Sequence, residues 1–69
     1  MTKDDILSIS AEQGMKITHE LFTDDEYIEV LTNGDIRTEE GYIVSQDEFW
    51  RYRTEKYWDE GWSIYQESI

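Results

Sequence analysis

The acidic residues of this sequence stand mostly side by side, an arrangement that acid–base catalysis can use. Eleven of the 17 acidic residues stand beside another acidic residue, in five groups: Asp4 and Asp5; Asp24, Asp25 and Glu26; Glu39 and Glu40; Asp47 and Glu48; Asp59 and Glu60. A carboxylate pair can catalyse hydrolysis when a buried environment keeps one member protonated. We expect all five groups at exposed turns or helix ends, so they do not favour an enzyme.

Other residues that commonly take part in catalysis or metal binding are scarce. His19 is the only histidine, and cysteine is absent. The chain has no Ser-His-Asp order, no HExxH motif and no phosphate-binding loop, so we predict no catalytic site and no cofactor. Asp24, Asp25, Glu26 and Glu29 offer oxygen ligands to a hard cation such as Ca²⁺. Because the spacing of an EF-hand is missing, we predict no metal site.

The charge balance indicates what kind of partner the chain would attract. Six basic residues against 17 acidic ones give a formal net charge of −11. This charge argues against direct binding of nucleic acid, which requires basic side chains that neutralise phosphates. A basic protein surface would be steered towards the chain. Such binding takes the form either of nucleic-acid mimicry or of plain charge complementarity, and the remaining alternative is that the acidity serves solubility alone.

The first half of the chain predicts one helix and a set of strands. Residues 3–13 favour a helix, with Thr2 as its N-cap and Gly14 as its end. Residues 15–22 alternate in polarity, as a strand does, and residues 26–32 are rich in β-branched and aromatic side chains. Asn33 and Gly34 are typical of a hairpin turn that leads into residues 35–38. Residues 39–41 favour a second turn or a bulge, and residues 42–44 complete the strand region.

A second helix is predicted where Ser45 and Glu48 form a capping box. Trp50, Thr54, Tyr57 and Trp58 follow at helical spacing, and Gly61 is the expected end. Residues 62–66 then alternate as a short strand would, although a continuous helix through residue 66 also fits the spacing.

The element order predicts one α+β domain over residues 1–69. It consists of a small antiparallel sheet of three to four strands, an N-terminal helix and an aromatic-rich C-terminal helix. We expect Trp50, Tyr57 and Trp62 in the core and Tyr52 exposed. No stretch is apolar over the roughly 20 residues of a membrane span, and no signal peptide is visible. We therefore expect a cytoplasmic protein without membrane contact.

Four segments carry a resemblance to small, uncharacterised acidic bacteriophage proteins: ITHELFTDDEYIEV, EEGYIV, EFWRYR and WDEGWSIY. The resemblance covers about residues 17–65 and carries over no catalytic residue. It implies a viral context in which small acidic proteins inhibit host enzymes or defence systems, as anti-restriction and anti-CRISPR proteins do, several of them as DNA mimics. For this chain it implies an inhibitor in the host cytoplasm.

The sequence predicts a non-enzymatic binding protein that blocks a basic, nucleic-acid-binding surface of a host protein. In a hairpin arrangement, the acidic residues of segments 24–29 and 39–40 would lie near one edge of the sheet, with a tyrosine providing apolar contact. The predicted partner-binding residues are Asp24, Asp25, Glu26, Tyr27, Glu29, Glu39, Glu40, Tyr42 and Tyr52. The alternative is a structural protein that forms a homodimer or larger assembly through its Trp- and Tyr-rich C-terminal segment.

Overall fold

The first helix, α1 (Lys3–Gln13), begins and ends where the sequence predicts. In the computed structural model, which describes residues 2–66, Thr2 Oγ1 accepts a 3.3 Å hydrogen bond from the Asp5 N–H. At the other end, Gly14 has a φ of 65° and donates its N–H to Ser10 O at 2.9 Å. A left-handed residue at this position closes a helix at little steric cost only when it lacks a Cβ.

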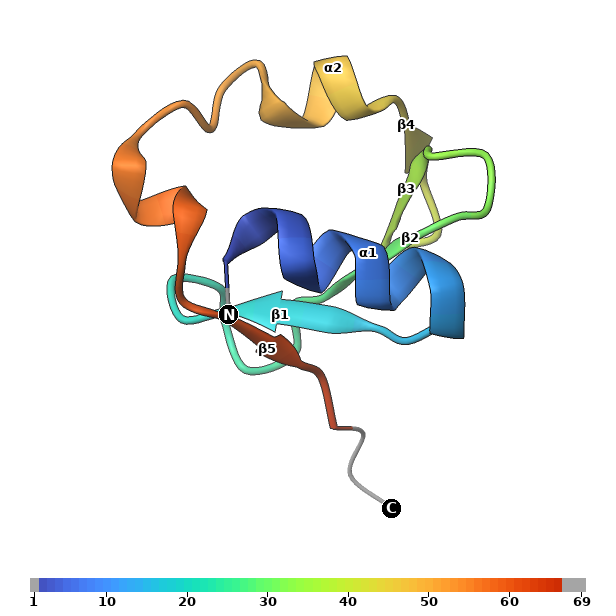
Figure 1. The fold of residues 1–69 in the computed structure, drawn as a ribbon, viewed down its shortest axis with the longest axis horizontal. Coiled ribbons are helices and arrows are strands. Elements are labelled where there is room, and N and C mark those ends of the chain that lie inside the picture. Colours follow the sequence, from blue (N-terminus) through green and yellow to red (C-terminus); the bar gives the residue numbers. More distant parts are fainter. Residues whose placement is uncertain (1, 67–69) are drawn as a thin grey trace.

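Within residues 2–66, five short strands form one antiparallel sheet with the order β4-β3-β2-β1-β5 (Figure 1). The prediction of an α+β fold is confirmed, and the sheet has one strand more than the largest number expected. Each strand is also shorter than predicted. Their bounds are β1 (Ile17–His19), β2 (Ile28–Val30), β3 (Ile36–Thr38), β4 (Ile43–Val44) and β5 (Trp62–Ile64).

The last strand decides between the two predictions for the C-terminal segment. β5 pairs with β1 through Ile17 and Ile64, Thr18 and Ser63, and His19 and Trp62. A strand at 62–64 is therefore confirmed, and a helix that continues through residue 66 is wrong. Pairing with a strand more than 40 residues earlier stabilises the extended form of a segment whose local spacing also suits a helix.

The second helix is much shorter than predicted. α2 (Gln46–Trp50) follows Ser45, whose Oγ accepts a 3.1 Å hydrogen bond from the Glu48 N–H, so Ser45 is confirmed as the N-cap of this helix. The expected continuation to Gly61 is wrong, because a turn follows Trp50 and a 3₁₀ helix, η1 (Lys56–Asp59), comes later. At the turn, Arg53 donates its N–H to Trp50 O and its Nη1 to Phe49 O, both at 3.0 Å.

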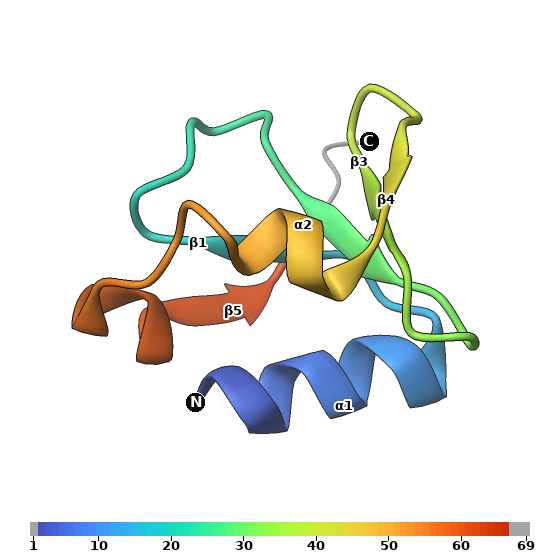
Figure 2. The same ribbon diagram turned by 90° about the horizontal axis from the view of Figure 1, so that it is seen from above.

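The core lies between the helices and one face of the sheet, which curves around them (Figures 1 and 2). Its buried apolar side chains come from α1, α2 and four strands: Ile6, Ile17, Ile28, Val30, Ile36, Phe49 and Trp62. Trp50 and Trp58 pack against this cluster, while Tyr57, which we expected there, is 50% exposed. Tyr57 lies on η1 rather than on the predicted helix, so the spacing argument that placed its ring inward does not apply.

Candidate functional site

Two acidic loops lie at the same end of the sheet. The loop from β1 to β2 carries Asp24, Asp25 and Glu26, and the loop from β3 to β4 carries Glu39 and Glu40. Ile28 is the first residue of β2 and pairs with Thr38, the last residue of β3. The end of the first loop and the start of the second loop therefore lie side by side. Figure 2 shows both connections extending on the same side of the molecule. We call these five residues the acidic end.

Hydrogen bonds hold both loops in defined conformations. In the first loop, Glu26 donates its N–H to Thr23 O at 3.1 Å, and Thr18 Oγ1 donates to Glu26 O at 2.9 Å. In the second loop, the N–H groups of Gly41 and Thr38 donate to Thr38 O and Tyr42 O, both at 2.9 Å. Four of the five carboxylates at the acidic end are exposed, and Glu26 is half-buried. The negative charges therefore project from backbone that is already ordered.

The two tyrosines beside these loops differ in their surroundings. Tyr42 directly follows the second loop and is 67% exposed. Tyr27 is half-buried, with its ring 4.6 Å from that of Tyr65 and the Lys16 ammonium 4.9 Å from its centre. Tyr42 thus offers the larger aromatic surface at the acidic end, whereas Tyr27 packs within the chain.

Glu29 and Tyr52, also predicted to bind a partner, lie outside the two loops. Glu29 sits within β2, and its carboxylate forms a 2.7 Å ion pair with Arg37 across the strand pair. Its negative charge is therefore compensated within the sheet. Tyr52 follows α2, on the segment that leads to η1, and is 79% exposed as predicted.

His19 is buried, and both ring nitrogens have hydrogen-bond partners. Its Nδ1 accepts a 3.1 Å hydrogen bond from the Leu21 N–H, while Nε2 lies 2.6 Å from Glu60 O and 3.0 Å from Tyr57 O. Because carbonyl oxygens only accept, the Nε2 atom carries the proton in this arrangement. The ring also packs against the rings of Trp58 and Trp62, 4.5 and 4.8 Å away. His19 therefore joins β1 to the η1–β5 segment.

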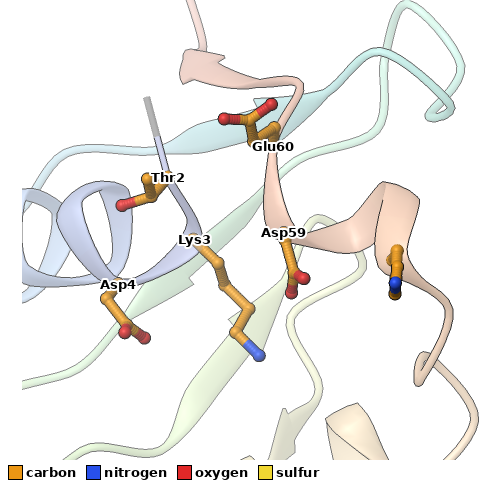
Figure 3. Close-up of a pocket in the computed structure, with 6 residues that line it drawn as sticks. Thr2, Lys3, Asp4, Asp59 and Glu60 are labelled. Atoms are coloured by element: carbon orange, nitrogen blue, oxygen red, sulfur yellow. The ribbon is translucent and has the colours of Figure 1, made fainter.

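A wide, open pocket lies beside the N-terminus of α1 (Figure 3). Its volume is about 600 Å³, and it is lined by Thr2 and by side chains of both charge signs: Lys3, Asp4, Lys56, Asp59 and Glu60. Lys3 extends its ammonium over the ring of Trp50, 4.6 Å from the centre. The mixed charges and open shape give this pocket no single ligand preference.

Residues 2–66 offer neither a metal-binding cluster of side chains nor a membrane-spanning helix. They contain no group of three or more His, Cys, Asp or Glu side chains arranged to hold a metal ion. Within the same part of the chain, no helix has the length and apolar character needed to cross a membrane.

One surface residue near the acidic end was not recognised from the sequence. Ile43 lies on β4, at the edge of the sheet, and is 58% exposed. The sequence places it in an apolar Tyr-Ile-Val run, which gives no sign of the face it occupies. The alternation of side chains along a strand could have identified it. Val44 shares the core face with Ile36, so the preceding residue, Ile43, must point outward.

Comparison of the chain with protein-family models, with curated proteins and with solved structures found no match.

Proposed function

We propose that the protein is a phage-type inhibitor that binds a basic, nucleic-acid-binding surface of a host enzyme or defence complex. The acidic end is the binding surface, and Tyr42 contributes apolar contact area. The mechanism is blockade, in which the bound inhibitor occupies the surface that nucleic acid would otherwise reach.

The observation that carries this proposal is the convergence of two acidic loops at one end of the sheet. Asp24, Asp25, Glu39 and Glu40 are exposed there, on backbone held by hydrogen bonds. Ordered, clustered carboxylates attract a basic surface and lose little conformational freedom on binding. Duplex DNA presents one negative charge per roughly 1.7 Å of its axis, and clustered carboxylates can stand in for its phosphates on a basic surface. Mimicry of DNA is thus the specific form of blockade that we propose.

Self-association through the Trp- and Tyr-rich C-terminal segment is the competing proposal. Trp62 is buried, and Trp50 and Trp58 pack against the core, so the three largest rings of that segment are used within one chain. Tyr52 and Tyr57 remain as its exposed rings. Sizing chromatography with light scattering at low and high salt distinguishes a monomer from a homodimer.

Affinity capture from bacterial lysate tests the proposed function. The tagged protein is immobilised, and retained proteins are eluted with a salt series or with competing duplex DNA. We expect to retain a nucleic-acid-processing protein that is released both by salt and by duplex DNA. Salt anions and DNA would each compete with the immobilised protein for the basic surface of that partner. Retention that DNA does not affect would contradict mimicry, and recovery of the bait alone would contradict the inhibitor proposal.

A further inference from the structure

The edge strand β4 presents backbone hydrogen-bonding groups that its neighbour β3 does not use. β4 stands at the end of the sheet order, and its residues pair with β3 as Arg37 with Ile43 and Ile36 with Val44. One position earlier, Thr38 donates its N–H to Tyr42 O. In an antiparallel ladder, hydrogen-bonded and non-hydrogen-bonded pairs alternate. The Ile43 N–H and C=O therefore point away from β3, towards the open edge.

The side chains along this edge are unusually apolar for an exposed position. Tyr42 is 67% and Ile43 58% exposed, and they are consecutive residues. Natural proteins commonly protect edge strands by keeping them very short or with lysine, proline, bulges or a covering element, because an open edge templates further pairing. β4 is two residues long, so its outward pairing is limited to the N–H and C=O of Ile43. Neither lysine nor proline occurs at 42–44. The edge thus combines unused backbone groups with apolar surface.

Negative charge flanks the edge along the chain on both sides. Glu39 and Glu40 precede β4, and Asp47 and Glu48 follow it in the first turn of α2; all four are exposed. The cross-strand neighbour Arg37 is the basic side chain opposite Ile43, and its charge is compensated by Glu29 at 2.7 Å. A strand that pairs with β4 must therefore be electrostatically compatible with acidic side chains on both of its flanks.

This charge distribution selects the kind of strand that fits. A second copy of the chain, itself at −11, would bring its own acidic groups against those of the first, and like charges across an interface oppose pairing. A segment with lysine or arginine on either side of an apolar residue meets opposite charge at both flanks and apolar surface in the middle. Backbone pairing of this type provides affinity, while the side-chain pattern provides specificity.

We infer that β4 accepts an extended, basic segment of the partner protein as an additional antiparallel or parallel strand. The Ile43 N–H donates to this segment and the Ile43 C=O accepts from it. The inference rests on the proposed function, which requires a basic partner, and adds the element through which that partner is held.

A defined peptide tests the pairing directly. The probe is an acetylated and amidated heptapeptide that alternates lysine and valine, titrated into the isotope-labelled protein and followed by NMR. We expect saturable binding and slower hydrogen exchange of the Ile43 amide, because that N–H becomes hydrogen-bonded. The same peptide with its central valine replaced by proline should bind at least about tenfold more weakly, since it lacks a backbone donor. An Ile43 amide that exchanges equally fast with and without peptide would overturn the inference.

Two substitutions at one position separate the backbone from the side chain. Ile43→Pro removes the outward N–H without removing a ladder hydrogen bond, as proline is tolerated on edge strands. Ile43→Thr keeps the N–H and the β-branched shape. We expect the first to weaken peptide binding at least about tenfold and the second less than about threefold. Equal peptide binding by wild type and the proline variant would overturn the inference. If the proline variant does not fold, the hydrogen exchange of the Ile43 amide in the wild-type protein decides the question.

The two proposals fail in different experiments. If lysate capture returns a partner that salt and DNA release, but the lysine–valine peptide leaves the Ile43 amide unprotected, the edge inference is wrong and the proposed function stands. If the peptide protects Ile43 while capture returns the bait alone, the inhibitor proposal is contradicted and β4 remains a strand-pairing edge.

Discussion

At the scale of single residues, Ser10 connects three parts of the chain through one hydroxyl group. Its Oγ donates to Met15 O at 2.6 Å and accepts from the Val30 N–H at 2.9 Å, and the side chain is fully buried. It thereby joins α1 to β2 and to the connection before β1. The hydrogen bond to Val30 is buried, so that N–H depends on the serine for its acceptor, whereas the hydrogen bond to Met15 O is partly buried.

Ser10→Ala should reduce the free energy of unfolding by about 1–3 kcal/mol, because it leaves the buried Val30 N–H without an acceptor. Urea unfolding followed by tryptophan fluorescence measures the change. Ser8→Ala is the matched control, since Ser8 lies on the same helix and is exposed, and we expect a change within about 0.5 kcal/mol. Equal effects of the two substitutions would show that the Ser10 hydrogen bonds contribute nothing.

The caps of the helices could be predicted from the sequence, whereas the surroundings of His19 could not. Thr2, Gly14 and Ser45 act within a few residues of themselves, so local chemistry determines their roles. The Nε2 partners of His19 are carbonyls 38 and 41 residues away. No local pattern encodes that distance, and the sequence could show only that a single histidine stands on a strand.

At the scale of elements, Gly61 lets η1 turn into β5 close against β1. Its φ is +87°, and a Cβ built on it would lie 2.9 Å from Glu20 Cδ and 3.0 Å from His19 Nε2. Its carbonyl also accepts the Glu20 N–H at 3.0 Å. The close approach of the two segments therefore depends on a residue without a side chain.

Gly61→Ala should destabilise the fold by about 2 kcal/mol or more, since left-handed strain of about 1–2 kcal/mol adds to the clash with the His19 ring. Gly41→Ala is the control, because its φ of +91° is similar and a Cβ there meets nothing within 4 Å. We expect the control to lose about 1 kcal/mol from backbone strain alone. Thermal unfolding compares the two, and equal losses would contradict the packing argument.

The strands could be predicted better than the second helix. The alternation over residues 15–22 holds within β1, where Ile17 and His19 are both buried, but it does not extend to Leu21, which is 57% exposed. After Ser45, the same kind of spacing argument failed, because α2 ends at Trp50 and the Arg53 side chain occupies the Phe49 carbonyl. Spacing of three and four residues is also compatible with separate short helices, so this pattern does not determine the path of the chain between Trp50 and Trp62.

Some features of the candidate site could likewise be predicted from the sequence, and others could not. The sequence correctly located the carboxylates in turns, and the β2–β3 register brings Glu26 and Glu39 to one end of the sheet. It could not tell that Glu29 is paired with Arg37 or that Tyr27 packs on Tyr65, because both partners come from other strands or from the chain's far end. Cross-strand pairs depend on register, which the sequence alone does not fix.

At the scale of the whole molecule, the net charge opposes the compact state. A charge of −11 resides on a chain whose described residues span 33 × 24 × 21 Å. Repulsion among like charges at such distances destabilises folding and is screened by salt. The proposed partner would relieve the same repulsion, which links the stability of the protein to its function.

Sodium chloride should therefore stabilise the protein. Raising the salt from about 0.01 M to 1 M shortens the Debye length from about 30 Å to 3 Å, and we expect the urea midpoint to rise. The triple variant Asp24→Asn, Asp25→Asn, Glu26→Gln should show a smaller rise, because it carries less negative charge. A midpoint that stays constant or falls with salt would contradict the view that self-repulsion limits stability.

The most direct test of the central claim compares two variants of equal net charge in their affinity for the captured partner. One neutralises the first loop of the acidic end through Asp24→Asn, Asp25→Asn and Glu26→Gln. The other neutralises three exposed acids elsewhere through Glu12→Gln, Glu55→Gln and Asp59→Asn. At low salt, we expect the loop variant to bind the partner at least about tenfold more weakly than wild type and the control variant less than about threefold more weakly. Equal losses in both variants would show that the partner senses total charge, and the acidic end would not be the binding surface.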